Sequence, residues 1–269
     1  MSDFETFFPP SEKQAIQDFL EKGYHRFKIK NTDLLKGLRH KLFQWSRELL
    51  GLDSDLDEVV FFDTVSDMVQ VSELNQFRMS LIQRLTSTLH IRPWLYHMAR
   101  EPLELLVGNE LAMQRSLNLS IQMPDDDSSL LPLHSDVWSG NSPYEVVFWM
   151  PLVDCYATKS MYILPRNVSD NVLADFPRYA GMSAEGFFKA LEPQMEWMNV
   201  PFGEALIFSH SIIHGNRINR EPHTRWTMNT RFKSLLSPYG SKELGESFLP
   251  ITIRPATRVG FEYEEPRLG

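Results

Sequence analysis

The spacing of the apolar residues changes once, near residue 110, and this change constrains the fold more than any other feature of the sequence. Before it, residues 11 to about 110 are mostly helical in pattern. Ser11 is a plausible N-cap for a first helix, and apolar residues recur at helical intervals over 34–50 and 68–89. Gly51 follows the second of these segments and predicts its end.

From about Leu111 onward the pattern has a period of two, which is typical of strands. Segments 117–123 and 225–232 each place apolar side chains on one face and polar side chains on the other. Segment 145–153 is almost entirely apolar, which indicates a central strand. We therefore predict an α+β protein, with a helical N-terminal layer packed on a β-sandwich or open barrel.

No Gly- or Ser-rich linker divides the chain, so we expect one domain over residues 1–269. Its helical part covers about 1–110 and its β core about 111–260. Two such layers around one core are a common architecture for a chain of this length.

The composition limits which cofactors and partners the protein can bind. Cys155 is the only cysteine in the sequence, which excludes a disulfide scaffold and a cysteine-based zinc or iron–sulfur centre within the chain. A chain without disulfides fits the reducing cytoplasm, which is the expected location. The net charge of −8 argues against nucleic acid as a partner. The first residues carry no signal-peptide pattern, and the longest apolar stretch, 146–153, is too short to cross a membrane. A small-molecule substrate is the expected partner, and the oligomeric state is left open.

A candidate metal site follows from three residues in order along the chain. His134 and Asp136 are two positions apart, so on an extended segment both side chains project the same way. His214 precedes a Gly-Asn turn, and two histidines with one carboxylate form the facial triad of non-heme Fe(II) oxygenases. Arg225 lies 11 residues further on and offers a bidentate partner for a carboxylate. His210 competes with His214 for the ligand role, and the Gly-Asn turn favours His214.

In these motifs the sequence resembles the phytanoyl-CoA dioxygenase-like family of Fe(II)/2-oxoglutarate-dependent oxygenases. The residues that carry the resemblance are EKGYHRFKI at 21–29, LHSD at 133–136, EVVFWMPLVD at 145–154, YILPRN at 162–167, GEALIFSHSIIHGN at 203–216, and Arg225. More narrowly, residues 131–155 look like oxygenases of bacterial carbohydrate biosynthesis clusters.

The resemblance implies a double-stranded β-helix core, the cupin-like jelly roll. It implies that His134, Asp136 and His214 bind Fe(II) and that Arg225 binds the distal carboxylate of 2-oxoglutarate, with O2 as the second co-substrate. Gln122 and Asn216 are candidate neighbours of 2-oxoglutarate. The expected reaction is oxidation of a substrate C–H bond, by default hydroxylation, with desaturation or epimerisation as other outcomes.

The expected substrate is a small polar metabolite, such as a sugar or nucleotide-sugar. Asn118 belongs to a polar strand face, Trp138 is placed to stack on a ring, and Arg231 lies on the same strand face as Arg225. Surface packing is the alternative for Trp138, and a salt bridge to an acidic residue is the alternative for Arg231. There are two alternative functions. One is a cupin-like metal-dependent isomerase or epimerase that uses the same triad without 2-oxoglutarate, so that Arg225 is not needed. The other is a catalytically silent binding barrel.

Overall fold

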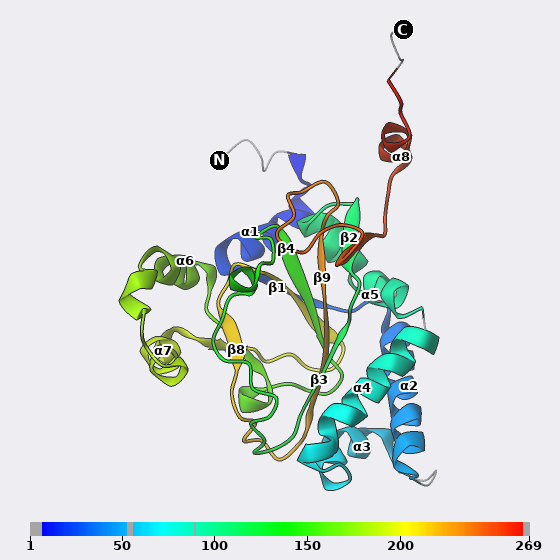
Figure 1. The fold of residues 1–269 in the computed structure, drawn as a ribbon, viewed down its shortest axis with the longest axis vertical. Helices are drawn as coiled ribbons and strands as arrows, with labels where there is room; N and C mark the ends of the chain where they lie inside the picture. Colours follow the sequence, from blue (N-terminus) through cyan, green and yellow to red (C-terminus); the bar gives the residue numbers. More distant parts are fainter. Residues whose placement is uncertain (1–6, 53–55, 89, 266–269) are drawn as a thin grey trace.

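The computed structural model describes residues 7–52, 56–88 and 90–265 (Figure 1). The helices are α1 (Pro10–Lys22), α2 (Thr32–Leu50), α3 (Glu58–Thr64), α4 (Val71–Thr88), α5 (Ile91–Leu106), α6 (Arg166–Ala174), α7 (Ala184–Leu191) and α8 (Pro255–Phe261). The strands are β1 (Tyr24–Lys28), β2 (Leu111–Gln114), β3 (Asn118–Gln122), β4 (Glu145–Pro151), β5 (Met161–Ile163), β6 (Glu196–Trp197), β7 (Glu204–Ser209), β8 (His214–Asn216), β9 (Arg225–Ser234) and β10 (Phe248–Pro250).

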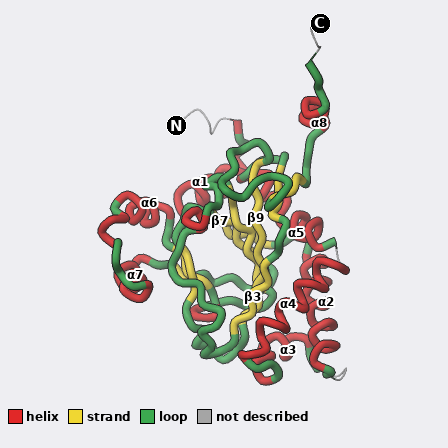
Figure 2. Tube along the Cα trace, viewed as in Figure 1, coloured by secondary structure: helices red, strands yellow, loops and turns green. Residues whose placement is uncertain are grey.

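The strands form two antiparallel sheets (Figure 2). The larger sheet has the order β1-β7-β4-β9-β2-β10, and β3 pairs with the first half of β9. The smaller sheet has the order β6-β5-β8. Non-consecutive strands are neighbours in both sheets, so long-range pairing builds the core, and the predicted α+β class is confirmed.

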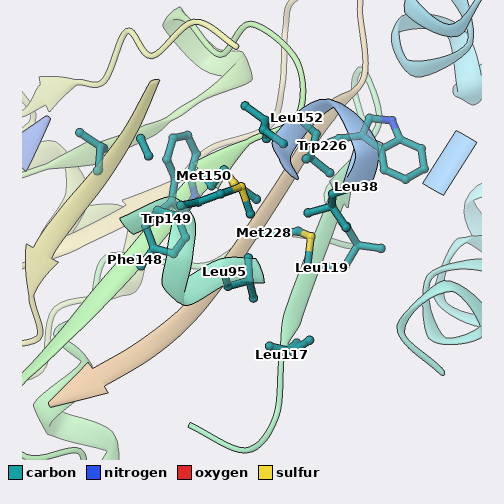
Figure 3. Close-up of a cluster of buried hydrophobic side chains, with 14 of the residues drawn as sticks. Leu38, Leu95, Leu117, Leu119, Phe148, Trp149, Met150, Leu152, Trp226 and Met228 are labelled. Carbon is teal, nitrogen blue, oxygen red and sulfur yellow. The ribbon is translucent and has the colours of Figure 1, made fainter. Parts of the chain in front are cut away.

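Strand β9 separates two environments because its side chains alternate between faces. On one face, the ring of Trp226 lies 4.9 Å from that of Phe62 and 6.1 Å from that of Phe77, which come from α3 and α4. Figure 3 shows Met228 of the same strand beside Leu38 of α2. This apolar face anchors the helical layer, so the polar face of β9 is directed away from the helices.

The predicted helices of the N-terminal half are confirmed, with one correction. Helix α2 ends at Gly51, whose φ of 63° is the left-handed conformation that glycine adopts without strain. Helix α4 matches the predicted segment 68–89, whose residue 89 lies outside the described part. Ser11 is not an N-cap: α1 begins one residue earlier, at Pro10, whose fixed φ suits the first turn.

Two helices between β5 and β6, α6 and α7, interrupt the half in which we predicted strands. They lie on the side of the molecule away from α2, α3 and α4 (Figure 1). Phe188 of α7 packs edge-on against Tyr162 of β5, with 5.4 Å between ring centroids. Ser183 caps α7 by accepting a hydrogen bond from the amide of Gly186, a signal that the period-two interpretation overlooked.

Helix α8 also lies within the predicted β core, and none of its residues is buried. Among the described residues, no helix combines the length and the apolar character needed to cross a membrane.

Candidate metal centre

His134 and His214 face each other across a short antiparallel bridge. The amide of His134 donates to the carbonyl of His214 at 2.9 Å, and the amide of His214 donates to the carbonyl of His134 at 2.8 Å. Their imidazole centroids are consequently 4.4 Å apart. The backbone alone therefore brings together two side chains that are 80 positions apart in the sequence.

Both imidazoles are oriented in the same way. Nδ1 of His134 lies 2.7 Å from the carbonyl of Pro132, and Nδ1 of His214 lies 3.2 Å from the carbonyl of Ile212. A carbonyl only accepts, so in each ring Nδ1 carries the hydrogen. The lone pair of each Nε2 is then free, which is the arrangement found in metal-binding histidines.

Asp136 completes the group from the first position of a short 3-10 turn over Asp136–Ser139. Its Oδ1 lies 3.8 Å from Nε2 of His134 and accepts a hydrogen bond from Nη2 of Arg231 at 3.2 Å. One donor atom from each of His134, Asp136 and His214 lies within 4.8 Å of the others, so the three can hold one metal ion.

The electrostatics suit a cation. Burial, and then the neighbouring His134, lower the pKa of His214 to about 4, so its ring is neutral at physiological pH. Burial alone raises the pKa of a carboxyl group, but His214 and Arg231 outweigh it and hold the pKa of Asp136 below its usual range. Two imidazoles and one carboxylate are the donor set of the 2-His-1-carboxylate triad.

Gly215 permits the close packing beside His214. A Cβ at this position would lie 2.9 Å from the carbonyl oxygen of Leu131 and 2.5 Å from the hydroxyl of Tyr162. A larger residue would push the 131–134 segment away from β8. The glycine after the histidine therefore has a steric role at the site.

Arg225 is fully buried at the start of β9. Its Nη1 donates to the carbonyl of Ser160 at 3.2 Å and its Nη2 to Oγ of Ser120 at 3.3 Å. Burial lowers the pKa of Arg225 to about 10, so it stays charged, yet its Nε has no hydrogen-bond partner and it forms no ion pair with a described residue. A buried cation without a counter-ion is costly, and a ligand carboxylate would remove that cost.

The two other residues predicted near 2-oxoglutarate, Gln122 and Asn216, differ in whether their side chains keep a polar atom available for a ligand. Gln122 pairs with Arg225 across β3 and β9, and its amide donates to the carbonyl of Arg217 at 2.7 Å. Its buried Oε1 has no hydrogen-bond partner among the residues that the structure describes. Asn216 accepts from the amide of Leu131 at 2.6 Å and donates to the carbonyl of Ser129 at 3.3 Å. The Asn216 side chain thus holds the loop before His134.

The predicted substrate residues fall in three different settings. Asn118 is exposed on β3 and donates to Oδ1 of Asn229 at 2.9 Å. Trp138 is 41% exposed, and its ring lies 5.2 Å from that of Phe176 in the segment between α6 and α7. Arg231 forms an ion pair with Asp136, which is the salt-bridge alternative stated above, because the same face of β9 that carries Arg225 passes beside the triad.

Glu145 was missed by the sequence analysis. It was counted as the first residue of an apolar strand, but it is buried with its Oε2 3.3 Å from Nδ1 of His210. The available signal was a carboxylate at the start of an otherwise apolar strand, since a buried acid needs a partner. His210 itself is fully buried and lies outside the group of three ligand atoms.

Comparison with known proteins places this site in a known fold. No family model matches the sequence, and no curated protein matches it significantly. Solved structures do match. The non-heme monooxygenase ThoJ in complex with nickel has a TM-score of 0.51 at 14% identity, over 89% of this chain and 84% of ThoJ. The carbocyclase SnoK from nogalamycin biosynthesis has a TM-score of 0.51 at 15% identity, over 89% of this chain and 96% of SnoK.

HygX from Streptomyces hygroscopicus, with nickel and 2-oxoglutarate bound, has a TM-score of 0.52 at 12% identity, over 84% of this chain and 88% of HygX. The fold is that of the non-heme iron and 2-oxoglutarate-dependent enzymes. The predicted cupin-like jelly roll is thereby confirmed. In HygX this fold holds nickel and 2-oxoglutarate, and the sequence predicts Fe(II) and 2-oxoglutarate here.

Proposed function

We propose that the protein is a non-heme Fe(II)/2-oxoglutarate-dependent dioxygenase that oxidises a C–H bond of a small polar metabolite. His134, Asp136 and His214 hold the iron, and Arg225 binds the distal carboxylate of 2-oxoglutarate. The observation that carries the proposal is the buried Arg225, which has no counter-ion in the described part of the chain, because a bare metal-binding site would not need this cation.

The position of Arg225 supports this division of roles. Arg225 and Arg231 lie on the same face of β9, six residues apart, and Arg231 contacts Asp136. One face of β9 therefore carries Arg231, which contacts the proposed metal ligand Asp136, and Arg225, which has no described counter-ion. A dicarboxylate that chelates the metal at one end can present its other carboxylate to that cation, which also fixes its orientation.

When bound, iron with 2-oxoglutarate and O2 supplies the oxidation, and 2-oxoglutarate leaves as succinate and CO2. The protein's own residues bind, orient and exclude water. The Nδ1 hydrogen bonds to Pro132 and Ile212 fix both imidazoles, and Arg231 fixes the carboxylate. The free Oε1 of Gln122 lies directly across the sheet from Arg225 and is available to the co-substrate or a bound water.

For the substrate, we propose a sugar or nucleotide-sugar and hydroxylation as the outcome. Asn118 and Asn229 on adjacent strands offer polar contacts, and the half-exposed Trp138 offers a ring face next to Asp136. The motif resemblance to the phytanoyl-CoA dioxygenase-like family, and to its carbohydrate branch, supports this choice. Asn216 acts in this proposal by fixing the loop before His134. We further propose that residues 1–269 work as one domain.

An anaerobic titration of metal-free protein with Fe(II) and 2-oxoglutarate, followed by visible absorption, tests the proposal. We expect a weak charge-transfer band that needs both components and that disappears in His134→Ala and His214→Ala. His97→Ala is the matched control, because this histidine is exposed on α5. Metal binding without the band would favour the isomerase or epimerase alternative, and no metal binding would leave a binding barrel.

Succinate release in the presence of candidate sugars and nucleotide-sugars then tests the substrate class. Coupled turnover with long-chain acyl substrates and none with polar ones would contradict the proposal. An active Arg225→Ala variant with unchanged dependence on 2-oxoglutarate would contradict the co-substrate role.

A further inference from the structure

His210 lies buried between two carboxylates, one of which belongs to the triad. Its Nδ1 is 3.3 Å from Oε2 of Glu145, and its Nε2 is 3.6 Å from Oδ2 of Asp136. The side chains of His210 and Glu145 are fully buried, and that of Asp136 is 8% exposed. The imidazole thus joins the start of β4 to the 3-10 turn that carries the metal ligand.

Four polar atoms of Glu145, His210 and Asp136 face one another, and none has a hydrogen bond to a described residue. They are both ring nitrogens of His210, Oε2 of Glu145 and Oδ2 of Asp136. Buried polar atoms are paired in the great majority of cases. Here they form two complementary pairs, since an imidazole nitrogen and a carboxylate oxygen share one hydrogen. His210 thus offers one nitrogen to each carboxylate, at 3.3 Å for Glu145 and 3.6 Å for Asp136, so the three side chains form one unit.

The backbone holds this unit in place independently of any ligand. The amide of His210 donates to the carbonyl of Glu145 at 3.2 Å, and Oγ of Ser135 donates to the carbonyl of His210 at 2.9 Å. The amide of Ser142 donates to Oε1 of Glu145 at 2.9 Å, which leaves Oε2 directed at the ring. The orientation of His210 is therefore set before a metal binds.

We propose that His210, supported by Glu145, is a positioning residue that holds Asp136 through Oδ2, so that Oδ1 alone is presented to the metal. Two observations carry this. Oδ1 is the oxygen that lies 3.8 Å from Nε2 of His134, whereas Oδ2 is the oxygen on the His210 side. The inference rests on the proposed function, because it assigns a role in the same metal centre.

The acceptor chemistry of Asp136 orients the ring of His210. Oδ2 of Asp136 belongs to a carboxylate and only accepts, so Nε2 of His210 carries the hydrogen that faces it. Nδ1 of His210 then faces Oε2 of Glu145 at 3.3 Å. A glutamine at position 145 can donate its amide to Nδ1, whereas an alanine would leave Nδ1 without this partner.

Binding of Co(II) alone to the metal-free protein tests the inference without turnover. We expect His210→Phe, which keeps a ring but no N–H, to weaken Co(II) binding roughly 10–100-fold and to change the visible Co(II) spectrum, as loss of partners behind a metal ligand does. Glu145→Ala should weaken binding in the same direction. Glu145→Gln should restore the affinity and spectrum of the unmodified protein, because its amide can donate to Nδ1.

Met228→Ala is the matched control for lost stability, because Met228 is a buried residue on the helix-facing side of β9. It should lower the melting temperature and leave Co(II) affinity unchanged. If His210→Phe behaves in the same way, His210 only packs, and the inference is wrong. If His210→Phe abolishes binding while His214→Ala retains it, His210 is a ligand, and again the inference is wrong. Failure of the unmodified protein to bind Co(II) would instead overturn the proposed function.

Discussion

Arg225 and Arg231 lie on the same face of the same strand, yet the structure uses them differently. Arg231 donates to Oδ1 of Asp136 at 3.2 Å and to Oε1 of Gln114 at 3.1 Å. Arg225 is more deeply buried, but among the described residues its only hydrogen-bond partners are the uncharged oxygens of Ser160 and Ser120. A described carboxylate neutralises the charge of Arg231, whereas none neutralises that of Arg225.

Residue type and strand face therefore do not define a binding residue without the contacts that the side chain makes. Both arginines satisfy the pattern of a polar strand face. What separates them is whether a described carboxylate reaches the guanidinium. A buried cation without a paired anion raises the free energy of the folded protein, so binding of a ligand anion is favourable at that position.

The largest expected effect is that of Arg225→Met on 2-oxoglutarate binding. We expect affinity for 2-oxoglutarate to fall about 100-fold or more, since truncating one partner of a buried charge pair costs about 2–5 kcal/mol. Methionine keeps much of the side-chain volume and removes an unpaired charge, so the melting temperature without co-substrate should be unchanged or higher. Calorimetric titration with 2-oxoglutarate and thermal unfolding measure the two quantities. A lower melting temperature with unchanged affinity would show that Arg225 is structural.

The same substitution at Arg231 should have the opposite signature. Arg231→Met leaves Asp136 without its cation, so we expect metal affinity to fall roughly 10–100-fold. The free energy of unfolding should fall by about 1.5–3 kcal/mol, the usual contribution of a hydrogen bond to a charged group. Co(II) titration and denaturant unfolding, with Arg225→Met as the matched control, check this. Equal effects of the two variants would remove the distinction between the two arginines.

The effect expected from pH is smaller for each pH unit, and it arises at His214 of β8. His214 has a pKa of about 4 when folded and 6.5 as its ordinary value, so between these values the unfolded chain binds more protons. Stability of the metal-free protein therefore rises with pH across this window, by about 1.4 kcal/mol per pH unit for each such proton. Melting temperatures from pH 4 to pH 7 measure the slope, and a flat profile would contradict the burial of His214.

The smallest expected effect concerns the stretch of β9 between the two arginines. Asn118→Ala removes one exposed hydrogen bond to Asn229, so the free energy of unfolding should fall by about 1 kcal/mol or less. Metal and 2-oxoglutarate affinities should not change. A higher KM for the substrate, once it is known, would support the proposed substrate contact, and an unchanged KM would argue against it.

Much of this organisation was predictable because it depends on local patterns. The helix 34–50 with Gly51, the alternation over 225–232 and the apolar strand over 145–153 all follow from side-chain spacing. The helices α6 and α7 were not predicted, since their short apolar patterns resemble those of the strands around them. Ser11 failed as a cap because Pro10 already provides a suitable start for the helix.

The helical and β halves, the two faces of β9 and the residue types of the site follow from neighbouring positions along the chain. Which of these residues meet depends on the folded chain. His134 pairs with His214 through reciprocal backbone hydrogen bonds, Arg231 contacts Asp136, and no described carboxylate reaches Arg225. The physical reason is that the pairing of a charge depends on long-range strand register and burial, which no spacing along the chain records.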